Sequence, residues 1–566
     1  MASAASTTGA YDPSATATLF PTARSESLLE TLKSTLLPLL LPLSLVSFSL
    51  LVGAIQVADK ALRRVRKTNR IRRRKLLAAL HIDERAEGTR RRVLGFFHPY
   101  CNAGGGGERV LYEAIALHLS TDPTCVAVVY TGDYPGASKA DILAKAARRF
   151  DIQIDADRVA LVPLARRWMV EDSAWKSWTL LGQSYGSVWL GFEALAQLIP
   201  DVWIDTMGYA FTYPVVRLLD RSIPIAAYVH YPTISTDMLR RVQSRQQGHT
   251  NDAATANSKL RSNVKLAYYR LFAKCYAWAL ARADTVVGNG SWTAAHLSQL
   301  LHRKPHDKVK VVYPPCDTAQ LAGFALEGRT RTIVSLAQFR PEKEHPTQLY
   351  ILKQLRDAHP QLFEPSNEGG PVKLVMMGSS RNAEDEKRIT MLRALAAQLG
   401  LEAQVEFVVN ADFGAVLERL RTASIGISTM RDEHFGINVV EFMAAGLITV
   451  SHKSAGPWLD IAVPSANCPL PANADKSTTE SAEPKAQPTG YHADTVEQFA
   501  SVLATIFDQQ VKQPDEVLAM RTAARDRAQR VFGREAFVQS WNAELWSKLE
   551  ARLDAVQPQA AKKKEQ

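Results

Sequence analysis

The sequence EHFGINVVE at residues 433–441 is the most informative stretch of this 566-residue chain. It sets two carboxylates, Glu433 and Glu441, eight positions apart across a Phe-Gly loop. A predicted strand (residues 424–428, SIGIS) precedes the loop, and a predicted apolar helix (residues 439–445) follows it. The N–H groups of such a turn, together with the helix dipole, can hold an anionic diphosphate. The stretch therefore predicts a nucleotide-binding unit of an α/β protein.

The two carboxylates are expected to contact different parts of one ligand. Glu433, at the mouth of the loop, can accept hydrogen bonds from sugar hydroxyls. Glu441 lies about two helical turns into the predicted helix and can reach another group, such as a ribose. Phe435, Gly436 and Ile437 join them and are predicted to bind the same ligand. The spacing alone fits a loop carboxylate and a solvated helix residue equally well.

Strand and helix patterns alternate along the chain in two series, which predicts two α/β domains with parallel sheets. The predicted strands are residues 91–97, 125–130, 202–204, 224–229, 285–288 and 309–313, and then 332–336, 372–377, 405–409, 424–428 and 448–451. The two domains are expected at residues 91–325 and 326–535. Residues 536–566 are expected to form a helix that crosses back to the first domain, followed by a solvated tail. The polar residues 241–265 are predicted to be a mobile loop, and residues 464–490 a disordered insertion.

An apolar segment at residues 35–57 contains no charged residue and is long enough to span a bilayer as a helix. Ten Lys or Arg and no acidic residue follow between Lys60 and Lys75, and they supply nearly all of the net charge of +11. The positive-inside rule predicts a lumenal tail (residues 1–34), a transmembrane helix (35–57) and a basic cytosolic linker (58–90). A peripheral hydrophobic hairpin, interrupted by Pro38 and Pro42, is the alternative.

Several function classes are disfavoured by composition and spacing. The basic run carries no nucleic-acid-binding signature, so nucleic acid is not an expected partner. Five scattered cysteines with no CxxC pair indicate reduced thiols rather than a secreted disulfide framework. The triplet Asp155-Ala156-Asp157 resembles a metal-binding D-x-D, but it lacks a second half-site. No metal site is expected.

Further candidate binding residues follow predicted strands of both domains. Four consecutive glycines, including Gly105 and Gly106, lie between a strand and a helix, where backbone N–H groups can contact a phosphate or sugar. Arg340 and Lys343 follow the first strand of the second domain and can neutralise a diphosphate. A flexible glycine turn and a surface charge pair are the alternatives.

Two other features have more than one interpretation. His230 ends an apolar strand, where it can contact a sugar hydroxyl or phosphate, or serve as a core histidine. Four tryptophans (Trp168, Trp175, Trp178 and Trp189) lie within 22 residues. They fit a face on the membrane or an aromatic core equally well.

The E-x7-E pattern resembles that of retaining glycosyltransferases with the GT-B fold, in which two Rossmann-like domains face across a cleft. Longer stretches resemble one family of their GT4 group. These are FHPYCNAGGGGERVL (97–111), TLLGQS (179–184), DTMGYA (205–210), HYPTIS (230–235) and QFRPEK (338–343). That family comprises the GDP-mannose-dependent α-1,2-mannosyltransferases of the endoplasmic reticulum, which extend trimannosyl-chitobiosyl-diphosphodolichol in N-glycan precursor synthesis. The resemblance covers nearly the whole chain after residue 90.

The resemblance implies addition of the fourth and fifth mannoses from GDP-mannose, with retention and without a metal or other cofactor, on the cytosolic face of the endoplasmic reticulum. Expected partners are GDP-mannose, the dolichol-linked oligosaccharide, the membrane and other mannosyltransferases of the pathway. Glu433, His230 and Lys343 are the expected catalytic residues. Gly105, Gly106, Arg340, Lys343, Phe435, Gly436, Ile437 and Glu441 are expected to bind the donor.

One position departs from the wider group, which has arginine five residues before the lysine where this chain has Gln338. Arg340 is the nearest candidate to replace it. Another lipid-linked GT-B transferase, such as a UDP-GlcNAc-dependent one, and a non-catalytic GT-B-like membrane subunit are the rival interpretations.

Overall fold

The computed structural model describes residues 37–86, 89–235, 238, 243, 259–365, 370–465 and 487–553. The predicted tail at residues 1–34 and the start of the predicted transmembrane segment lie outside these ranges. The chain divides into two units, residues 1–68 and 69–566. Helix α2 (Leu37–Ala79) includes the described part of the apolar segment and continues through the basic run, so much of the predicted linker is helical. The described part from Ser44 to Ala79 is long and apolar enough to cross a membrane, by length and composition.

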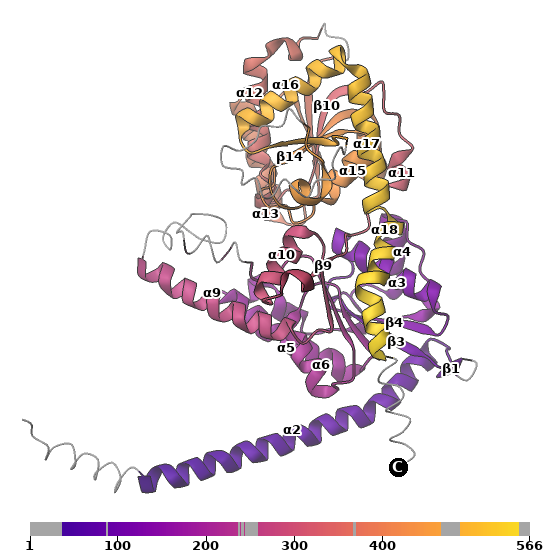
Figure 1. The fold of residues 1–566 in the computed structure, drawn as a ribbon, viewed down its shortest axis with the longest axis vertical. Helices are drawn as coiled ribbons and strands as arrows, with labels where there is room; N and C mark the ends of the chain where they lie inside the picture. The colour runs from indigo at the N-terminus through magenta and orange to yellow at the C-terminus, as the bar shows by residue number, and fades with distance from the viewer. Residues whose placement is uncertain are drawn as a thin grey trace, which may run out of the picture. The chain divides into compact units, whose positions relative to one another are not determined.

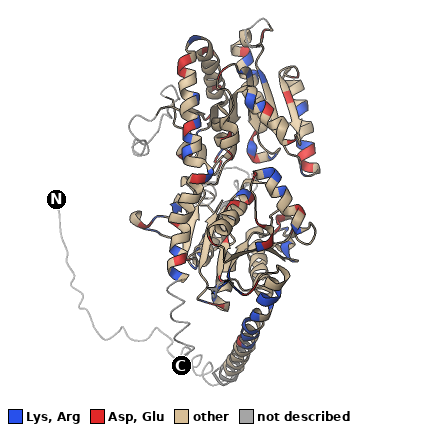
Figure 2. Ribbon diagram, turned by 90° about the vertical axis from the view of Figure 1, so that its right-hand side faces the viewer, with Lys and Arg blue, Asp and Glu red and all other residues tan. Residues whose placement is uncertain are grey.

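Lys and Arg residues gather in the second half of α2, where the ribbon in Figure 2 is blue in many places. Leu, Ala, Arg and Lys all have high helix propensity, which accounts for the uninterrupted helix. A short antiparallel pair, β1 (Arg85–Ala86) and β2 (Thr89–Arg90), follows it.

The first domain is built on a seven-stranded sheet in the order β5-β4-β3-β6-β7-β8-β9, and all of its strand pairs are parallel. Figure 1 draws this sheet with β3, β4 and β9 labelled. Its strands are β3 (Arg92–Phe97), β4 (Cys125–Thr131), β5 (Val159–Pro163), β6 (Val202–Asp205), β7 (Ile225–Val229), β8 (Thr285–Gly288) and β9 (Lys310–Val311). The helices α3 (Gly106–Thr121), α4 (Lys139–Phe150), α5 (Thr179–Gln197), α6 (Tyr213–Leu219), α9 (Lys259–Leu280) and α10 (Ser291–Leu300) accompany it. Strands such as β3 and β4 are buried and almost wholly apolar, as expected for a parallel sheet covered on both faces.

The second domain has a six-stranded parallel sheet in the order β12-β11-β10-β13-β14-β15. Its strands are β10 (Thr330–Leu336), β11 (Lys373–Gly378), β12 (Val405–Val409), β13 (Ala423–Ser428), β14 (Ile448–His452) and β15 (Gly490–Ala493). The accompanying helices are α11 (Ala319–Ala322), α12 (His345–Ala358), α13 (Ala383–Gln398), α14 (Phe413–Thr422), α15 (Ile437–Ala445), α16 (Val496–Lys512) and α17 (Pro514–Phe532).

Each sheet has a point where the strand order reverses direction. In the first domain this point lies between β3 and β6, and in the second between β10 and β13. In open α/β sheets ligands bind outside the carboxyl ends of the strands at such switch points. The residues that follow these four strands are therefore the ones to compare with the predicted site.

The C-terminal segment returns to the first domain. Helix α18 (Arg534–Trp541) continues into a π-helical turn (Asn542–Trp546). Phe537, Trp541 and Leu545 are buried in the same core cluster as β3 and β4. The indole N–H of Trp541 donates to Nε2 of His118 at 3.1 Å. The first domain thus completes its core with residues from the end of the chain.

Two loop predictions need correction. The predicted loop at 241–265 is helical from residue 259, where α9 begins, because its Lys, Leu and Arg residues favour helix despite the polar composition. The predicted insertion at 464–490 ends in an ordered contact, in which Thr489 N donates to Val463 O at 2.9 Å and Gly490 opens β15. Residues 244–258 and 466–486 lie outside the described part.

Candidate active site

Lys343 and Glu433 form an ion pair at the switch point of the second sheet. Lys343 ends the short helical turn (Pro341–Lys343) after β10, and Glu433 lies in the loop after β13. The lysine Nζ donates to the Glu433 carboxylate, and both side chains are largely buried. The Thr429 hydroxyl donates to the carbonyl oxygen of Lys343 at 3.1 Å and accepts from the Gln348 amide at 3.0 Å. These hydrogen bonds fix the backbone that presents the lysine.

The loop that carries Glu433 depends on two glycines. Gly436 has a φ of 106° and is the N-cap of α15, a conformation that other residues rarely adopt. The N–H of Gly456 donates to the Glu433 carbonyl at 2.8 Å. A Cβ at position 456 would overlap the backbone of Phe435. Sequence analysis missed Gly456, although the Gly456-Pro457 pair is a recognisable turn signal.

Phe435 and Ile437 have different surroundings. Phe435 is buried against Tyr313 and Phe532, with ring centroids 5.7 and 5.6 Å away. Phe435 therefore anchors the Glu433 loop to the core through its aromatic contacts. Ile437 reaches the first domain, because a Cβ placed at Gly106 would overlap its Cδ1 atom. The glycine loop and the E-x7-E loop are thus in direct contact.

Glu108 shapes the glycine loop. Its buried carboxylate accepts hydrogen bonds from the N–H groups of Ala103 and Gly105. Gly105, a predicted donor-binding residue, donates its N–H to Glu108. Gly106 and Gly107 are the first two residues of α3, and the leading N–H groups of a helix have no intrahelical partner. They are the better-placed anion donors in this loop.

His230 adjoins the glycine loop at the end of β7. A Cβ at Gly107 would lie 3.3 Å from its Nε2 atom, which is buried and has no hydrogen-bond partner in the described structure. Burial lowers the pKa of His230 to about 4, so the imidazole is neutral at physiological pH. His98, which sequence analysis did not single out, contacts the Thr206 hydroxyl at 2.6 Å, and burial lowers its pKa to about 3. Two neutral histidines therefore adjoin the first domain's part of the site.

Glu441 lies in α15, the helix that follows the loop. Burial raises the pKa of its carboxyl to about 7, while the positive charges of Arg109 and Arg149, both from the first domain, oppose that shift. Arg109 also pairs with Asp317 at 3.6 Å. Glu441, a residue of the second domain, is thus influenced by charged residues of the first domain. Arg109 is one more residue near the site that the sequence did not indicate.

The pKa of Glu441 predicts a pH-dependent stability. At a pH below its ordinary pKa of 4.5 the carboxyl is neutral in both the folded and the unfolded chain. Folding then buries no charge at Glu441, and its contribution to stability does not depend on pH. Between 4.5 and about 7 the unfolded chain releases this proton while the folded chain keeps it, so the free energy of unfolding falls across this range and levels off above it. Glu441→Gln should therefore unfold at a higher temperature than the parent protein above this range. The gain should exceed about 1 kcal/mol and vanish in acid.

Thermal unfolding of the purified, ligand-free protein across this pH range measures the effect. The exposed Glu535 provides a matched control as Glu535→Gln. A difference between Glu441→Gln and the parent that does not vary with pH would contradict the raised pKa.

An aromatic group joins the two domains beside Glu433. The ring of His434 lies 4.2 Å from Tyr231 and 5.0 Å from Trp292. Asp460, buried in the second domain, accepts from the N–H of Ser291 and from the Tyr313 hydroxyl, both at 2.9 Å. These contacts span the two domains and hold the Glu433 loop, and sequence spacing gave no sign of them.

Arg340 is half-buried, and its guanidinium lies 3.7 Å from Glu342. Its Nε atom is buried without a hydrogen-bond partner in the described structure. Asp155 caps a short turn, accepting from the N–H of Asp157 at 3.1 Å and from Arg158 Nε at 2.6 Å. Within the described ranges no three His, Cys, Asp or Glu side chains cluster as a metal site.

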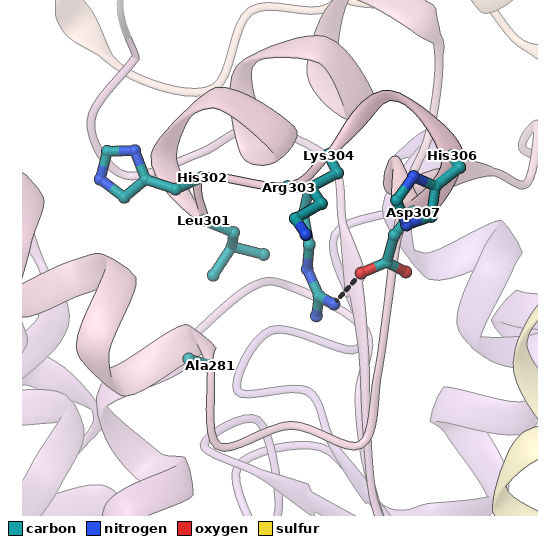
Figure 3. A pocket seen from close by; sticks show the side chains of 7 residues that line it. All are labelled: Ala281, Leu301, His302, Arg303, Lys304, His306 and Asp307. Atoms are coloured by element: carbon teal, nitrogen blue, oxygen red, sulfur yellow. Dashed lines mark hydrogen bonds and ion pairs between the residues drawn. The ribbon is translucent and has the colours of Figure 1, made fainter.

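A surface pocket of about 470 Å³ lies elsewhere, between the end of α9 and the loop after α10 (Figure 3). It is lined by Ala281, Leu301, His302, Arg303, Lys304, His306 and Asp307. None of the predicted site residues borders it. Within this pocket the Arg303 guanidinium donates a hydrogen bond to the Asp307 carboxylate at 2.6 Å.

Comparison with known proteins relates both halves of the chain to glycosyltransferases. Residues 91–301 match the family described as ALG11 mannosyltransferase N-terminus, and residues 318–468 match glycosyl transferases group 1. Sucrose-phosphate synthase from Thermosynechococcus elongatus has a similar fold (TM-score 0.53, 13% identity, 81% of this chain and 100% of that one). Anabaena Alr3699/HepE, crystallised with UDP, also has a similar fold (TM-score 0.51, 14% identity, 81% of this chain and 100% of that one).

Curated relatives are much closer in sequence. One from Homo sapiens is 41% identical over 452 residues, which is 79% of this chain and 85% of the relative. One from Neurospora crassa is 38% identical over 473 residues, which is 80% of this chain and 79% of the relative. Both are named GDP-Man:Man(3)GlcNAc(2)-PP-Dol alpha-1,2-mannosyltransferase.

With two parallel α/β domains, the group 1 match and these structural neighbours, the protein is a glycosyltransferase of the GT-B class. The chain belongs to the family of GDP-Man:Man(3)GlcNAc(2)-PP-Dol alpha-1,2-mannosyltransferases. The fold and family expected from the sequence are thereby confirmed. The roles of the individual site residues stay predictions.

Proposed function

We propose that this protein transfers mannose from GDP-mannose to dolichol-diphosphate-linked Man(3)GlcNAc(2), adding the fourth and fifth mannoses through α-1,2 linkages with retention. Family membership supports the donor and acceptor. The Lys343–Glu433 pair at the switch point supports catalysis, because it places a cation and a carboxylate where such a ligand would bind. This arrangement disfavours a non-catalytic subunit.

The proposed chemistry needs positive charge beside the leaving group. Cleavage of the anomeric C–O bond builds negative charge on the departing diphosphate. Lys343, Arg340 and the leading N–H groups of α3 and α15 would stabilise that charge from fixed positions. Because Lys343 already contacts Glu433, the donor must share the lysine with that carboxylate.

The remaining roles follow from the surroundings of each residue. Glu433 would accept hydrogen bonds from mannose hydroxyls, and Glu441 from the ribose. His230 is neutral, so it would accept or donate a single hydrogen bond through Nε2 rather than supply charge. Retention without a separate nucleophile fits attack on the same face, with the leaving phosphate oxygen taking the proton of the acceptor hydroxyl.

The protein is proposed to reside in the endoplasmic reticulum membrane as a single-pass protein with cytosolic catalytic domains. The apolar, then basic, character of α2 supports that orientation. Other mannosyltransferases of the same pathway are proposed neighbours there.

Mass analysis of products made by the purified, detergent-solubilised full chain tests the function. Supplied with GDP-mannose and a trimannosyl-chitobiosyl-diphospholipid, it should add one and then two hexoses. UDP-N-acetylglucosamine should add nothing. Transfer from the UDP-sugar alone would favour the rival donor, and no transfer from either by folded protein would favour the scaffold interpretation.

Substitution of Glu441 should affect donor binding. We expect Glu441→Ala to raise the KM for GDP-mannose by about 10- to 100-fold, since the loss of one hydrogen bond to a charged group costs about 1.5–3 kcal/mol. Gln299→Ala, on the exposed face of α10, is the control and should leave KM unchanged. Steady-state kinetics with varied donor provide the measurement. Equal KM values for the two variants would remove Glu441 from the donor site.

Metal removal should leave the rate unchanged. Lys343 and Arg340 can provide the charge that a divalent cation supplies in metal-dependent transferases. Asp155 already accepts hydrogen bonds as a turn cap, so its carboxylate is engaged. Initial rates with and without EDTA provide the measurement. A loss of activity that Mn²⁺ restores would contradict metal independence.

A further inference from the structure

Within the part of the chain that the structure describes, two segments cross from one domain to the other, and they lie side by side. The first crossing runs from β9 to α11, and the second from α17 to α18, which only Gly533 separates. The N–H of Cys316, in the first crossing, donates to the carbonyl oxygen of Phe532, at the end of α17, at 2.9 Å. A Cβ at Gly533 would lie 3.2 Å from the hydroxyl oxygen of Thr318. Rotation of one domain against the other must therefore bend the chain at these paired crossings.

Helix α3 of the first domain makes an ion pair with each crossing. In the first, Arg109 Nη2 lies 3.6 Å from the Asp317 carboxylate. In the second, Arg534 Nε donates to the Glu113 carboxylate at 2.8 Å. Residues four positions apart, such as Arg109 and Glu113, lie on the same side of a helix, so one side of α3 contacts both crossings. We call these four side chains the crossing network.

The charges of the crossing network act on one another. Glu113 is 4% exposed, and burial raises the pKa of its carboxyl. The positive charges of Arg534 and Arg109 oppose that rise, whereas the negative charge of Asp317 adds to it. When one partner of such a buried pair is lost, the other charge is left without compensation, which is strongly unfavourable. Removal of any one charge is therefore expected to disturb the contacts of the other three.

The crossing network adjoins the candidate donor site in both domains. Arg109 lies three residues after Gly106, with which α3 begins and against which Ile437 of the second domain packs. Burial raises the pKa of Glu441 in α15, Arg109 lowers it and Asp317 raises it further. The residues that join α3 to the first crossing thus also act on the carboxylate expected to bind the donor. Loss of the network would let the glycine loop and α15 move independently.

We propose that the crossing network fixes the arrangement of the two domains in which the donor site is complete, and that its members are positioning residues for donor binding. Asp317 and Glu113 carry the same sign of charge as a diphosphate, so they do not themselves attract it. They act through their arginine partners on the position of the glycine loop relative to α15. The inference rests on the proposed function for the identity of the donor alone.

The sign of one substitution distinguishes positioning from direct electrostatics. Asp317→Asn removes a negative charge near an anion site, so electrostatics alone would strengthen the binding of GDP. If Asp317 holds the domains in place, the same change should weaken GDP binding by about fivefold or more, as is usual for coupled sites. Glu113→Gln should weaken it in the same way. Calorimetric titration of the purified, detergent-solubilised full chain with GDP measures the affinity, and unchanged or tighter binding in Asp317→Asn would overturn the proposal.

Two further variants separate positioning from a general loss of ion pairs. Arg534→Lys keeps the charge and should bind GDP nearly as the parent does, because Arg534 contacts Glu113 through one nitrogen, whereas Arg534→Gln should weaken binding. Arg303→Gln is the matched control. It removes the Arg303–Asp307 pair at 2.6 Å, which lies away from the crossings, and should change nothing. A loss of affinity in Arg303→Gln equal to that in Asp317→Asn would overturn the positioning role.

A distance between the domains reports their arrangement without any ligand. With Cys468→Ser in the background, spin labels at the exposed Cys275 on α9 and at Val511→Cys on α16 allow measurement by pulsed electron paramagnetic resonance. Asp317→Asn and Glu113→Gln should broaden or shift the distance distribution of the parent, and Arg303→Gln should leave it unchanged. Identical distributions in all of these proteins would overturn the proposal. Since this measurement needs neither donor nor transfer, its failure is distinct from a failure of the proposed function.

Discussion

Lys343→Met is expected to lower kcat by about 10²–10³-fold, the usual cost of removing one fixed group that stabilises developing negative charge. The lysine lies at the second sheet's switch point with its Nζ on Glu433. Methionine fills a similar volume without the charge. The diphosphate leaving group would lose its nearest cation, so the chemical step should suffer more than donor binding. Steady-state kinetics of the purified protein with varied GDP-mannose measure both constants.

The ion pair itself offers a competing, purely structural explanation. If Lys343 served only to neutralise Glu433, the double variant Lys343→Met/Glu433→Gln should recover activity together with thermal stability. We expect it to recover stability and to remain inactive, because both groups act on the substrate. Lys343→Arg provides a further control, since it keeps the charge but changes the donor geometry. Recovery of kcat in the double variant would contradict the catalytic role.

Gly456→Ala is expected to reduce activity by a comparable factor without touching the donor. The new Cβ would lie 2.7 Å from the Phe435 carbonyl carbon and closer still to its oxygen, so backbone must move. That shift would break the hydrogen bond from Gly456 N to Glu433 O and displace the carboxylate. A misplacement of about 1 Å in a catalytic group can cost about 10²-fold in rate.

Gly323→Ala is the matched control for this substitution. A Cβ there meets only Gln320 O at 3.7 Å, an ordinary contact, so activity should be unchanged. Comparison of kcat and unfolding temperature for the two variants separates displacement of the loop from a general loss of stability. Full activity in Gly456→Ala would show that the Glu433 loop tolerates the shift.

The elements predicted from the sequence agree best with the structure where the prediction depends on a short run of neighbouring residues. Buried strands such as β4 and β13 follow from short apolar runs, and the glycine loops follow from residues that permit unusual backbone conformations. The switch-point positions of Lys343 and Glu433 follow once the alternation of strands and helices is accepted, because consecutive parallel strands end at the same edge. The short strand β15 was missed, since its register depends on β14 rather than on its own composition.

Contacts between distant segments could not be predicted in the same way. Asp460 caps α10 across 169 positions of sequence, and Glu108 accepts a hydrogen bond from the N–H of Gly105. No pattern in the sequence reports which buried carboxylate is nearest to a given N–H group. The exposure of Trp178 and the burial of Trp541 likewise depend on which elements pack together.

The sequence by itself determined the α/β class, the two-domain order, the family and most of the polar residues of the candidate site. These features follow from the spacing of apolar residues and from motifs of consecutive residues, both of which can be recognised without the fold. Only the tertiary structure decided how they work together. It paired Lys343 with Glu433, left His98 and His230 neutral and raised the pKa of Glu441. Each of these properties depends on burial and on neighbours remote in sequence, which exist only once the chain has folded.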